Sequence, residues 1–506
     1  MSNHPRGLYM LSTVEMWERF SYYGMRAILS LFMVSTLMFT LPFAAKVYGI
    51  YTGLVFLTPL LGGYVSDRYL GNRKSIILGG SVMALGQFTL AYCASLYNPS
   101  VAIATHSGLI WSTQEILFLI GLILICFGCG FFKANISSMI SLLYEKNDNR
   151  LDSAFSIFYV GINIGSLIAP LIIGLFCSSS HPEFYKYGFF TAGIGLCIGL
   201  IIFLSFRNKY LKDVNGVDIG KRPILQEEHD IIDENLLDEA ILRKYDNDEE
   251  IIAKEKENLS KLSFDEKKKI LEGPLTKVEK HRIYVIFIIS FFAIFFFSAY
   301  EQAGVSLTFF TDVFISRSVG GFIVPTEWFQ SVNPLFIVIL APIFAMLWTK
   351  LNEKNLTLST PVKMSLGLLI LGIGFAVFAI PASSINAGSS SVSMLWIILL
   401  YFILTIAELF ISPVGLSTVS RLSPLKFTSL FLGVWFASSA VSNYLAGVLS
   451  ELYPDPSLPT PYLLGIIPIN GFFEFFILFA TFAIAGAIIV FLLRNKVVKW
   501  THGLEK

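Results

Sequence analysis

Apolar residues recur in long runs along the chain, and short polar stretches separate the runs. A helix needs about 20 predominantly apolar residues to cross a bilayer. Twelve runs meet that length, at residues 10–38, 43–66, 75–97, 113–144, 150–178, 186–206, 283–312, 327–349, 361–381, 392–420, 427–450 and 466–493. The pattern therefore predicts an all-α membrane protein with twelve transmembrane helices.

Basic residues in the connecting loops alternate between the two sides of the membrane. Cytoplasmic loops carry an excess of Lys and Arg. Outside the segment 207–282, the two termini and the loops after even-numbered spans hold fifteen Lys and Arg, whereas the opposite loops hold only Lys46, Lys186 and Arg317. This asymmetry predicts that both termini are cytoplasmic.

One segment differs from the rest of the chain in charge. Residues 207–282 hold 35 of the 73 charged residues and divide six spans from six. We therefore expect an N-terminal six-helix bundle over 1–206, a charged cytoplasmic linker over 207–282, and a C-terminal six-helix bundle with a short cytoplasmic tail over 283–506. The mixed charges favour a solvated linker, and a regulatory role is the alternative.

The composition excludes most soluble classes of protein. Hydrophobic residues make up 54% and charged residues 14% of the chain, against about 25% charged residues in a soluble domain. Such a chain has too little polar surface to be a secreted disulfide scaffold, a nucleic-acid binder or a coiled coil. Its expected partner is the lipid bilayer, and no nucleic acid is expected.

The chain carries no motif for enzymatic or ATP-driven chemistry. The only Gly-Lys pair, Gly220–Lys221, is followed by Arg222 rather than by Ser or Thr, and no HExxH occurs, so neither a phosphate-binding loop nor a zinc protease motif is present. Cys126 and Cys129 form a CxxC inside an apolar run, which favours helix packing over a redox or metal site. We therefore expect no enzymatic activity, no ATP-driven step, no cofactor and no metal.

Ionisable residues inside membrane spans mark functional sites, because the insertion of each costs roughly 2.5–3.5 kcal/mol. Here seven of them fall on the first, fourth, seventh and tenth spans, whereas Glu474 on the twelfth span is an exception that we place near the outer interface. The seven are Glu15, Glu18, Arg19 and Arg26, followed by Lys133, Glu301 and Glu408. Charges on every third span predict four three-helix repeats whose first helices line a shared cavity, as in transporters built from internal repeats.

Charges of opposite sign from the two halves of the chain are expected at equal depths in the membrane. At about 1.5 Å per residue, Arg26 and Glu301 lie about 30 Å from the cytoplasmic face, and Lys133 and Glu408 lie about 20 Å from it. We predict an Arg26–Glu301 pair at the outer gate and a Lys133–Glu408 pair that flanks a central site. Static structural ion pairs are the alternative, although buried pairs stabilise proteins weakly.

The first span carries a polar stripe. Glu15, Glu18, Arg19, Tyr22 and Arg26 recur at spacings of three and four residues, which places them on one helix face. Burial and a neighbouring arginine have opposite effects on the proton affinity of a carboxylate. Two glutamates beside one arginine therefore predict a site that holds or releases a proton as its geometry changes.

Several stretches resemble the signatures of a known family. Residues 63–73, GYVSDRYLGNR, resemble a loop signature of the major facilitator superfamily. Residues 15–24, EMWERFSYYG, are similar to the ExxERFxYYG motif of the proton-dependent oligopeptide transporter family. Further stretches fit the same family at FFKANIS (131–137), FYVGINIGSL (158–167), Glu301–Gln302, QSVNP (330–334) and ELFISP (408–413).

The resemblance implies the major facilitator fold of two six-helix bundles and the proton-coupled import of di- and tripeptides by alternating access. Such a protein is a multi-pass protein of the plasma membrane, here expected to be a bacterial inner membrane. Carried over to this sequence, the resemblance gives Glu15, Glu18, Arg19 and Glu301 as proton-coupling residues.

The same resemblance implies the substrate and gate residues. Lys133 and Arg26 attract the peptide carboxylate, Glu408 holds the amino terminus together with Asn163 and Asn333, and aromatic side chains line the pocket. The implied substrate-binding residues are Tyr22, Tyr23, Arg26, Lys133, Asn163, Asn333, Glu408 and Trp435, and the implied gating residues are Arg26, Glu301, Lys133 and Glu408. For Trp435, packing is the alternative.

The chain departs from the family pattern in two places. Many bacterial members insert two helices between the halves, but 207–282 is too charged for that, and animal members carry a histidine where this chain has Gly49. The proton role then depends on the glutamates. Two other functions remain open, namely the transport of another solute, such as nitrate or a conjugated metabolite, and a non-transporting membrane receptor or scaffold.

Overall fold

The computed structural model describes residues 4–504 except 99–103, 146–147, 149, 215, 222–237, 239–240, 264–265, 268, 271–272, 355, 357, 390 and 425–426. Within these residues, long helices occupy all twelve predicted spans. In the first half they are α1 (Arg6–Ser35), α2 (Leu41–Val65), α3 (Asn72–Ser95), α4 (Thr113–Ser141), α5 (Leu151–Ile173) and α6 (Tyr185–Tyr210). In the second half they are α11 (Lys277–Tyr300), α12 (Ser306–Phe314), α13 (Val332–Glu353), α14 (Thr360–Asn386), α15 (Met394–Leu422), α16 (Thr428–Ser450) and α17 (Phe472–Trp500).

Short elements connect these helices. They are the π-helical turn η1 (Ser66–Leu70), the 3-10 turns η2 (Pro182–Phe184), η4 (Glu301–Gly304) and η5 (Thr326–Ser331), and the helix α9 (Glu249–Leu259). Six two-residue strands form three small pairs, β1 (Ile315–Ser316) with β4 (Val392–Ser393), β2 (Ser318–Val319) with β3 (Phe322–Ile323), and β5 (Tyr462–Leu463) with β6 (Ile467–Pro468).

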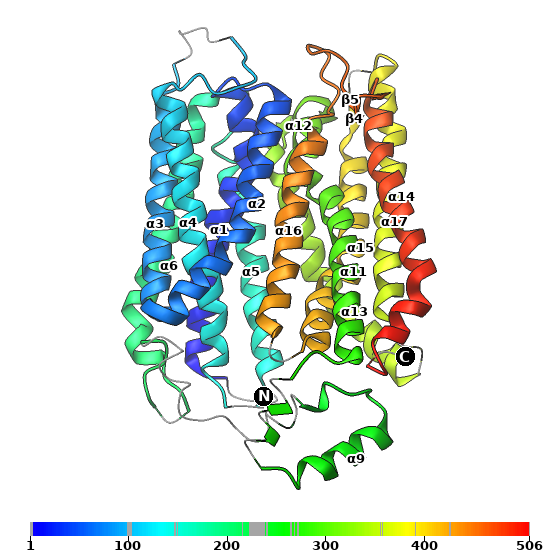
Figure 1. Cartoon of the computed structure of the whole chain (residues 1–506). Helices are drawn as coiled ribbons and strands as arrows, with labels where there is room; N and C mark the ends of the chain where they lie inside the picture. Colours follow the sequence, from blue (N-terminus) through cyan, green and yellow to red (C-terminus); the bar gives the residue numbers. More distant parts are fainter. Residues whose placement is uncertain are drawn as a thin grey trace.

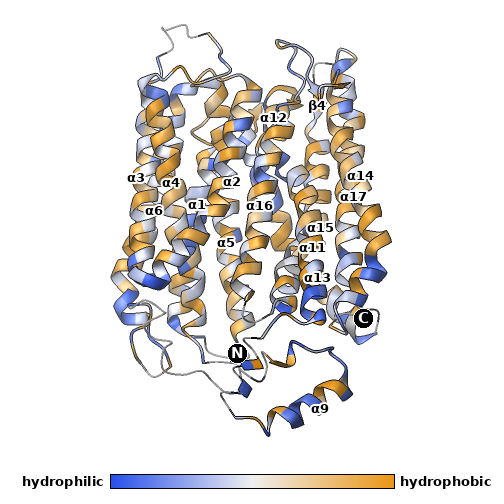
Figure 2. Cartoon of the chain, viewed as in Figure 1, coloured by the Kyte–Doolittle hydropathy of each residue, from blue (hydrophilic) through white to orange (hydrophobic). Residues whose placement is uncertain are grey.

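The long helices are apolar enough and long enough to be membrane spans. Among the described residues, eleven helices are long and apolar enough to cross a bilayer, with α11, η4 and α12 counted as one span. The first helix, α1, falls outside that criterion because its polar stripe, Glu15 to Arg26, places four charges within it. In Figure 2 the long helices are mostly hydrophobic, whereas hydrophilic residues gather in α9 and at the nearby helix ends.

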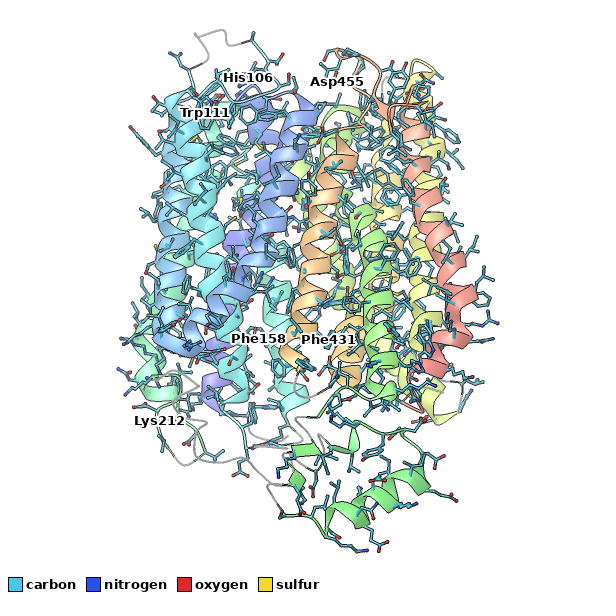
Figure 3. The ribbon with its side chains drawn as sticks, viewed as in Figure 1. His106, Trp111, Phe158, Lys212, Phe431 and Asp455 are labelled. Carbon is cyan, nitrogen blue, oxygen red and sulfur yellow. The ribbon has the colours of Figure 1, made fainter. Side chains whose placement is uncertain are left out.

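The two halves of the chain lie side by side. Figure 1 shows the helices of the first half, in blue to cyan, on one side and those of the second half, in green to red, on the other. Both termini and α9 lie at the same end of the helices, which we call the terminal end; the other end is the opposite end. Figure 3 labels Phe158 of α5 and Phe431 of α16 toward the terminal end, so both helices run from that end to the opposite end.

The two halves contact each other closely at two crossings in the part of the molecule nearer the opposite end. The backbones of α2 and α16 meet at two glycines, because a Cβ atom on Gly49 would lie 2.8 Å from the Cα atom of Gly447. At a second crossing, Ser331 Oγ donates to the Leu167 carbonyl at 2.7 Å, and Trp328 Nε1 donates to the Leu171 carbonyl at 3.0 Å. These residues lie in the later turns of α5 and α16, in η5 and in the early turns of α2.

The close approach at Gly447 gives a prediction about stability. A Cβ atom there would lie 2.6 Å from the Ala45 carbonyl oxygen and 2.7 Å from Gly49 Cα, and backbone atoms cannot rotate away. We expect Gly447→Ala to lower the free energy of unfolding by roughly 1–3 kcal/mol, as overpacking does. Thermal unfolding of the purified protein measures this effect. The matched control is Gly433→Ala on the same helix, where a Cβ atom meets only Leu60 at 3.5 Å; equal losses from both variants would contradict the prediction.

The seventh predicted span is not one continuous helix. It divides into α11, the 3-10 turn η4 and α12. The side chain of Gln302 stabilises this break, since its Nε2 donates to the carbonyls of Ser298 and Ala446 at 3.1 Å and its Oε1 accepts from the hydroxyls of Ser306 and Ser450. A break inside a membrane is tolerated where side chains satisfy the freed backbone groups. Sequence periodicity does not locate it, because both sides of the break are apolar.

The described part of the charged segment contacts both halves. Arg73 of α3 donates to the carbonyls of Leu211 and Ile219 at 2.6 and 2.7 Å. Arg282 donates to the carbonyls of Arg243 and Thr501 at 2.7 and 3.1 Å. Arg282 lies within α11, so the last residues of the predicted linker 207–282 belong to that helix, and α6 likewise extends to Tyr210.

Candidate functional site

The polar stripe of α1 forms a buried cluster of one arginine and two glutamates. Arg19 Nε lies 2.6 Å from Glu15 Oε1 and 3.0 Å from Glu18 Oε2, and all three residues are at most 5% exposed. Among the described residues, neither oxygen of Glu18 has a hydrogen-bond partner. A buried carboxylate without hydrogen bonds is costly. The predicted grouping of Glu15 and Glu18 around Arg19 is present in the structure.

A second ion pair joins the two halves. Arg26 of α1 pairs with Glu301 of η4 through Nη2 and Oε2. The Nε atom of Arg26 also donates to the Tyr48 hydroxyl at 2.5 Å, and the guanidinium lies over the Tyr48 ring. The predicted Arg26–Glu301 contact is therefore present, and α2 contributes a third member.

Lys133 faces the α1 cluster from α4. It interacts electrostatically with Glu15, Glu18 and Arg19, and its ammonium lies 4.4 Å from the centre of the Phe56 ring. In the described part of the chain no ion pair joins Lys133 to Glu408. The two residues lie on different halves, as predicted, but their contact is not formed in this structure.

Glu408 of α15 accepts hydrogen bonds from two neighbouring helices. The Tyr300 hydroxyl donates to Glu408 Oε2 at 2.6 Å, and Asn333 Nδ2 donates to the same oxygen at 3.1 Å. Asn333 also donates to the Thr405 hydroxyl at 3.0 Å. The structure thus brings the predicted residues Asn333 and Glu408 together.

Aromatic residues of the first half face this group across the molecule. Tyr23 of α1 and Tyr159 of α5 lie close enough to Tyr300 to interact electrostatically with it, and Tyr159 also interacts with Glu408. Tyr159 is 45% exposed, so part of its side chain remains accessible although it lies close to Glu408.

The remaining predicted residues lie nearby but are engaged by their own helices or neighbours. Tyr22 is buried beside Tyr23, with the two ring centres 5.3 Å apart. Asn163 Nδ2 donates to the Tyr159 carbonyl at 2.9 Å. Trp435 is 6% exposed and packs where a Cβ atom on Gly415 would lie, so its indole fills space between α15 and α16 in this conformation.

Three polar residues of this region were not predicted from the sequence. Tyr48 and Tyr300 contact Arg26 and Glu408, but a tyrosine in an apolar run gives no signal that separates a polar contact from packing. Glu327 is different, because it is a charged residue at the predicted boundary of the eighth span. It is 1% exposed, and its Oε1 has no hydrogen-bond partner among the described residues. Its carboxylate was therefore detectable as an intramembrane charge.

Comparisons with known proteins agree with this arrangement. Residues 73–462 match the sequence profile of the POT family. The chain belongs to the POT family. The family is one of transporters, so membership confirms the prediction of a transporter rather than an enzyme and confirms the resemblance seen in the motifs.

Several relatives and solved structures of POT transporters cover nearly the whole chain. The peptide transporter YePEPT of Yersinia enterocolitica subsp. palearctica serotype O:3 (strain YE-P4) is 34% identical over 88% of this chain and 87% of its own length. The di-/tripeptide transporter of Lactococcus lactis subsp. cremoris is 32% identical over 89% of this chain and 90% of its own. The crystal structure of a peptide transporter POT in complex with sulfate superposes with a TM-score of 0.75 at 27% identity, covering 99% of this chain and 97% of that one. The POT fold predicted from the sequence is thus confirmed.

Proposed function

We propose that this chain imports di- and tripeptides together with protons by alternating access. The observation that carries the proposal is the placement of opposite charges on the two halves, with Lys133 on α4 and Glu408 on α15, and with Tyr159 of the first half close to Glu408. A short peptide is a zwitterion, so its two ends require a cation and an anion. Relatives that are named as peptide or di-/tripeptide transporters support the same substrate class.

The proton path is assigned to the glutamates. Glu15 and Glu18 share Arg19, and a change in its position leaves one carboxylate without a cation. Glu301 faces Arg26 across the two halves, so separation of the halves exposes its carboxylate to water. A shift of Arg19 and a separation of Arg26 from Glu301 each change the proton affinity of a glutamate. Each therefore couples proton binding to the conformation of the carrier.

The peptide is assigned to the space between Lys133 and Glu408. Lys133 and Arg26 attract its carboxylate, and Glu408 with Asn163 and Asn333 holds its ammonium group. Tyr22, Tyr23 and Trp435 are assigned to the pocket wall. The gating residues are Arg26 and Glu301 at one level and Lys133 and Glu408 at the other.

The orientation follows from the distribution of basic residues. Loops rich in Lys and Arg lie on the cytoplasmic side, so the terminal end is assigned to the cytoplasm, with both termini inside a bacterial plasma membrane. The charged segment between α6 and α11 then lies in the cytoplasm as a linker. Contacts between the halves at the opposite end support an inward-open state, in which Arg26–Glu301 is paired and Lys133–Glu408 is not.

The decisive experiment is uptake into proteoliposomes. Saturable accumulation of labelled alanyl-alanine, driven by an inside-alkaline pH gradient, is the expected result. Accumulation of nitrate or of a conjugated metabolite without any di- or tripeptide would assign the fold to another solute. An absence of transport for every solute, with the protein folded, would favour a receptor or scaffold.

The assignment of Lys133 gives a separate prediction. We expect Lys133→Ala to raise the half-saturation concentration for alanyl-alanine by roughly 10-fold or more, since it removes a charged hydrogen-bond donor from the carboxylate. Carboxyl-blocked analogues, such as alanyl-alanine amide, should be affected much less, which inhibition of uptake by both compounds measures. Equal weakening of both ligands would refute the partner assigned to Lys133.

A further inference from the structure

Tyr300 lies between two polar groups, the Glu408 carboxylate with its hydrogen-bond partners and the Arg26–Glu301 ion pair. It is the last residue of α11, and the next residue, Glu301, begins the turn η4. Its hydroxyl donates to Glu408 Oε2 at 2.6 Å, whereas Glu301 pairs with Arg26. Two consecutive residues therefore contact the centre assigned to the peptide ammonium and the centre assigned to the outer gate.

The ring of Tyr300 is held in place by its own helix. It stacks on Phe296 with ring centres 5.7 Å apart and meets the edge of Phe297 at 6.3 Å. Aromatic pairs in these geometries are favourable beyond the area that they bury. The hydroxyl is thus fixed by packing on α11 and does not depend on Glu408 for its position.

Both side-chain donors on Glu408 from neighbouring helices end on one oxygen. Tyr300 and Asn333 both donate to Oε2, at 2.6 and 3.1 Å. Hydrogen bonds to a charged group are stronger and more directional than neutral ones. Ser412 of the same helix hydrogen-bonds to this carboxylate as well. The two donors on Oε2 restrict rotation of the carboxylate, which also lies close to Tyr159 of the first half.

We propose that Tyr300 is a positioning residue for amine recognition, which orients the Glu408 carboxylate toward the ammonium group of the peptide. This inference rests on the proposed function.

The test compares ligands with and without an amino group. Binding of alanyl-alanine and of propionyl-alanine, which has the same shape but lacks the ammonium, is measured on the purified protein. We expect Tyr300→Phe to weaken alanyl-alanine roughly 5- to 20-fold, since it removes one hydrogen bond to a charged group, and to leave propionyl-alanine unchanged. Tyr401→Phe is the matched control, because Tyr401 is a buried tyrosine of α15 whose hydroxyl contacts the Ala303 carbonyl at 3.5 Å rather than Glu408.

Two further variants separate positioning from a general loss of structure. In a Glu408→Gln background, Tyr300→Phe should have little additional effect on alanyl-alanine, because Tyr300 acts through that carboxylate. Tyr300→His retains a ring with an N–H donor and should recover part of the preference for the free amine, and it serves as the test if Tyr300→Phe does not fold.

The outcomes distinguish this inference from the proposed function. Equal weakening of both ligands by Tyr300→Phe, no effect on either ligand, or full additivity with Glu408→Gln would overturn the role of Tyr300 while leaving peptide binding intact. A folded wild-type protein that binds no dipeptide would overturn the proposed function, and the role of Tyr300 with it.

Discussion

Glu18→Gln should abolish the uphill accumulation of a dipeptide while leaving exchange of labelled for unlabelled peptide at least partly intact. Glu18 is 1% exposed, lies 3.0 Å from Arg19, and has no hydrogen-bond partner among the described residues. Glutamine retains the shape of the side chain but cannot bind or release a proton. Without that coupling the gradient has no effect on the carrier, so the ratio of internal to external peptide should fall to about 1.

Proteoliposomes measure both quantities, with accumulation under an inside-alkaline gradient and counterflow without one. Glu474→Gln provides the control, because Glu474 lies in the first turn of α17, away from the α1 cluster, and it should accumulate peptide normally. If Glu18→Gln reduced exchange and peptide binding as strongly as accumulation, Glu18 would be a ligand or a structural residue instead.

Replacement of either member of the Arg26–Glu301 pair should strongly reduce uptake and thermal stability. Replacement of both members should reduce stability by less than the sum of the two single losses. The side chains of Arg26 and Glu301 are only 11% and 10% exposed, and loss of one partner leaves a buried charge, which costs about 3–5 kcal/mol. We therefore expect Arg26→Met and Glu301→Gln each to reduce uptake by roughly 10-fold or more and to lower thermal stability, whereas the double variant recovers part of the stability.

An exposed ion pair is the control for this cycle. Lys261 and Glu257 lie 2.7 Å apart but are 65% and 72% exposed, so Lys261→Gln should change stability by no more than about 1 kcal/mol. Additive losses in the Arg26–Glu301 double variant would show that the two residues act independently.

Much of this architecture was readable from the sequence because a bilayer leaves few options. Each span must satisfy its own backbone hydrogen bonds as a helix, so apolar runs predicted the positions of the long helices. Charged residues within those apolar runs are costly to insert, so they could be recognised as candidate functional residues from the sequence. They are Glu15, Glu18, Arg19, Arg26, Lys133, Glu301 and Glu408. Helical rise also predicted the level at which Arg26 meets Glu301, and that ion pair is present.

The errors and omissions came from features without a one-dimensional signal. The break after Tyr300 is stabilised by Gln302, whose partners include Ala446 and Ser450, more than 140 residues away. For Trp435 the sequence left pocket lining and packing open, and in this conformation its indole lies against Gly415 of the neighbouring helix. Neither outcome follows from the composition of the segment that contains it.

By itself, the sequence determined the helical spans, the polar stripe of α1 and the family. The reason is that a backbone in lipid must form its hydrogen bonds within a helix, and that a charged side chain in lipid is costly and therefore rare outside functional sites. Only the tertiary structure decided the other contacts of these charges. It added Tyr48 to the predicted Arg26–Glu301 pair, held Glu408 through Tyr300 and Asn333, and left Lys133 beside Phe56. The physical reason is that contacts between helices depend on how two bundles pack and on where they separate, and a bundle that alternates between two conformations does not encode a single set of contacts in its sequence.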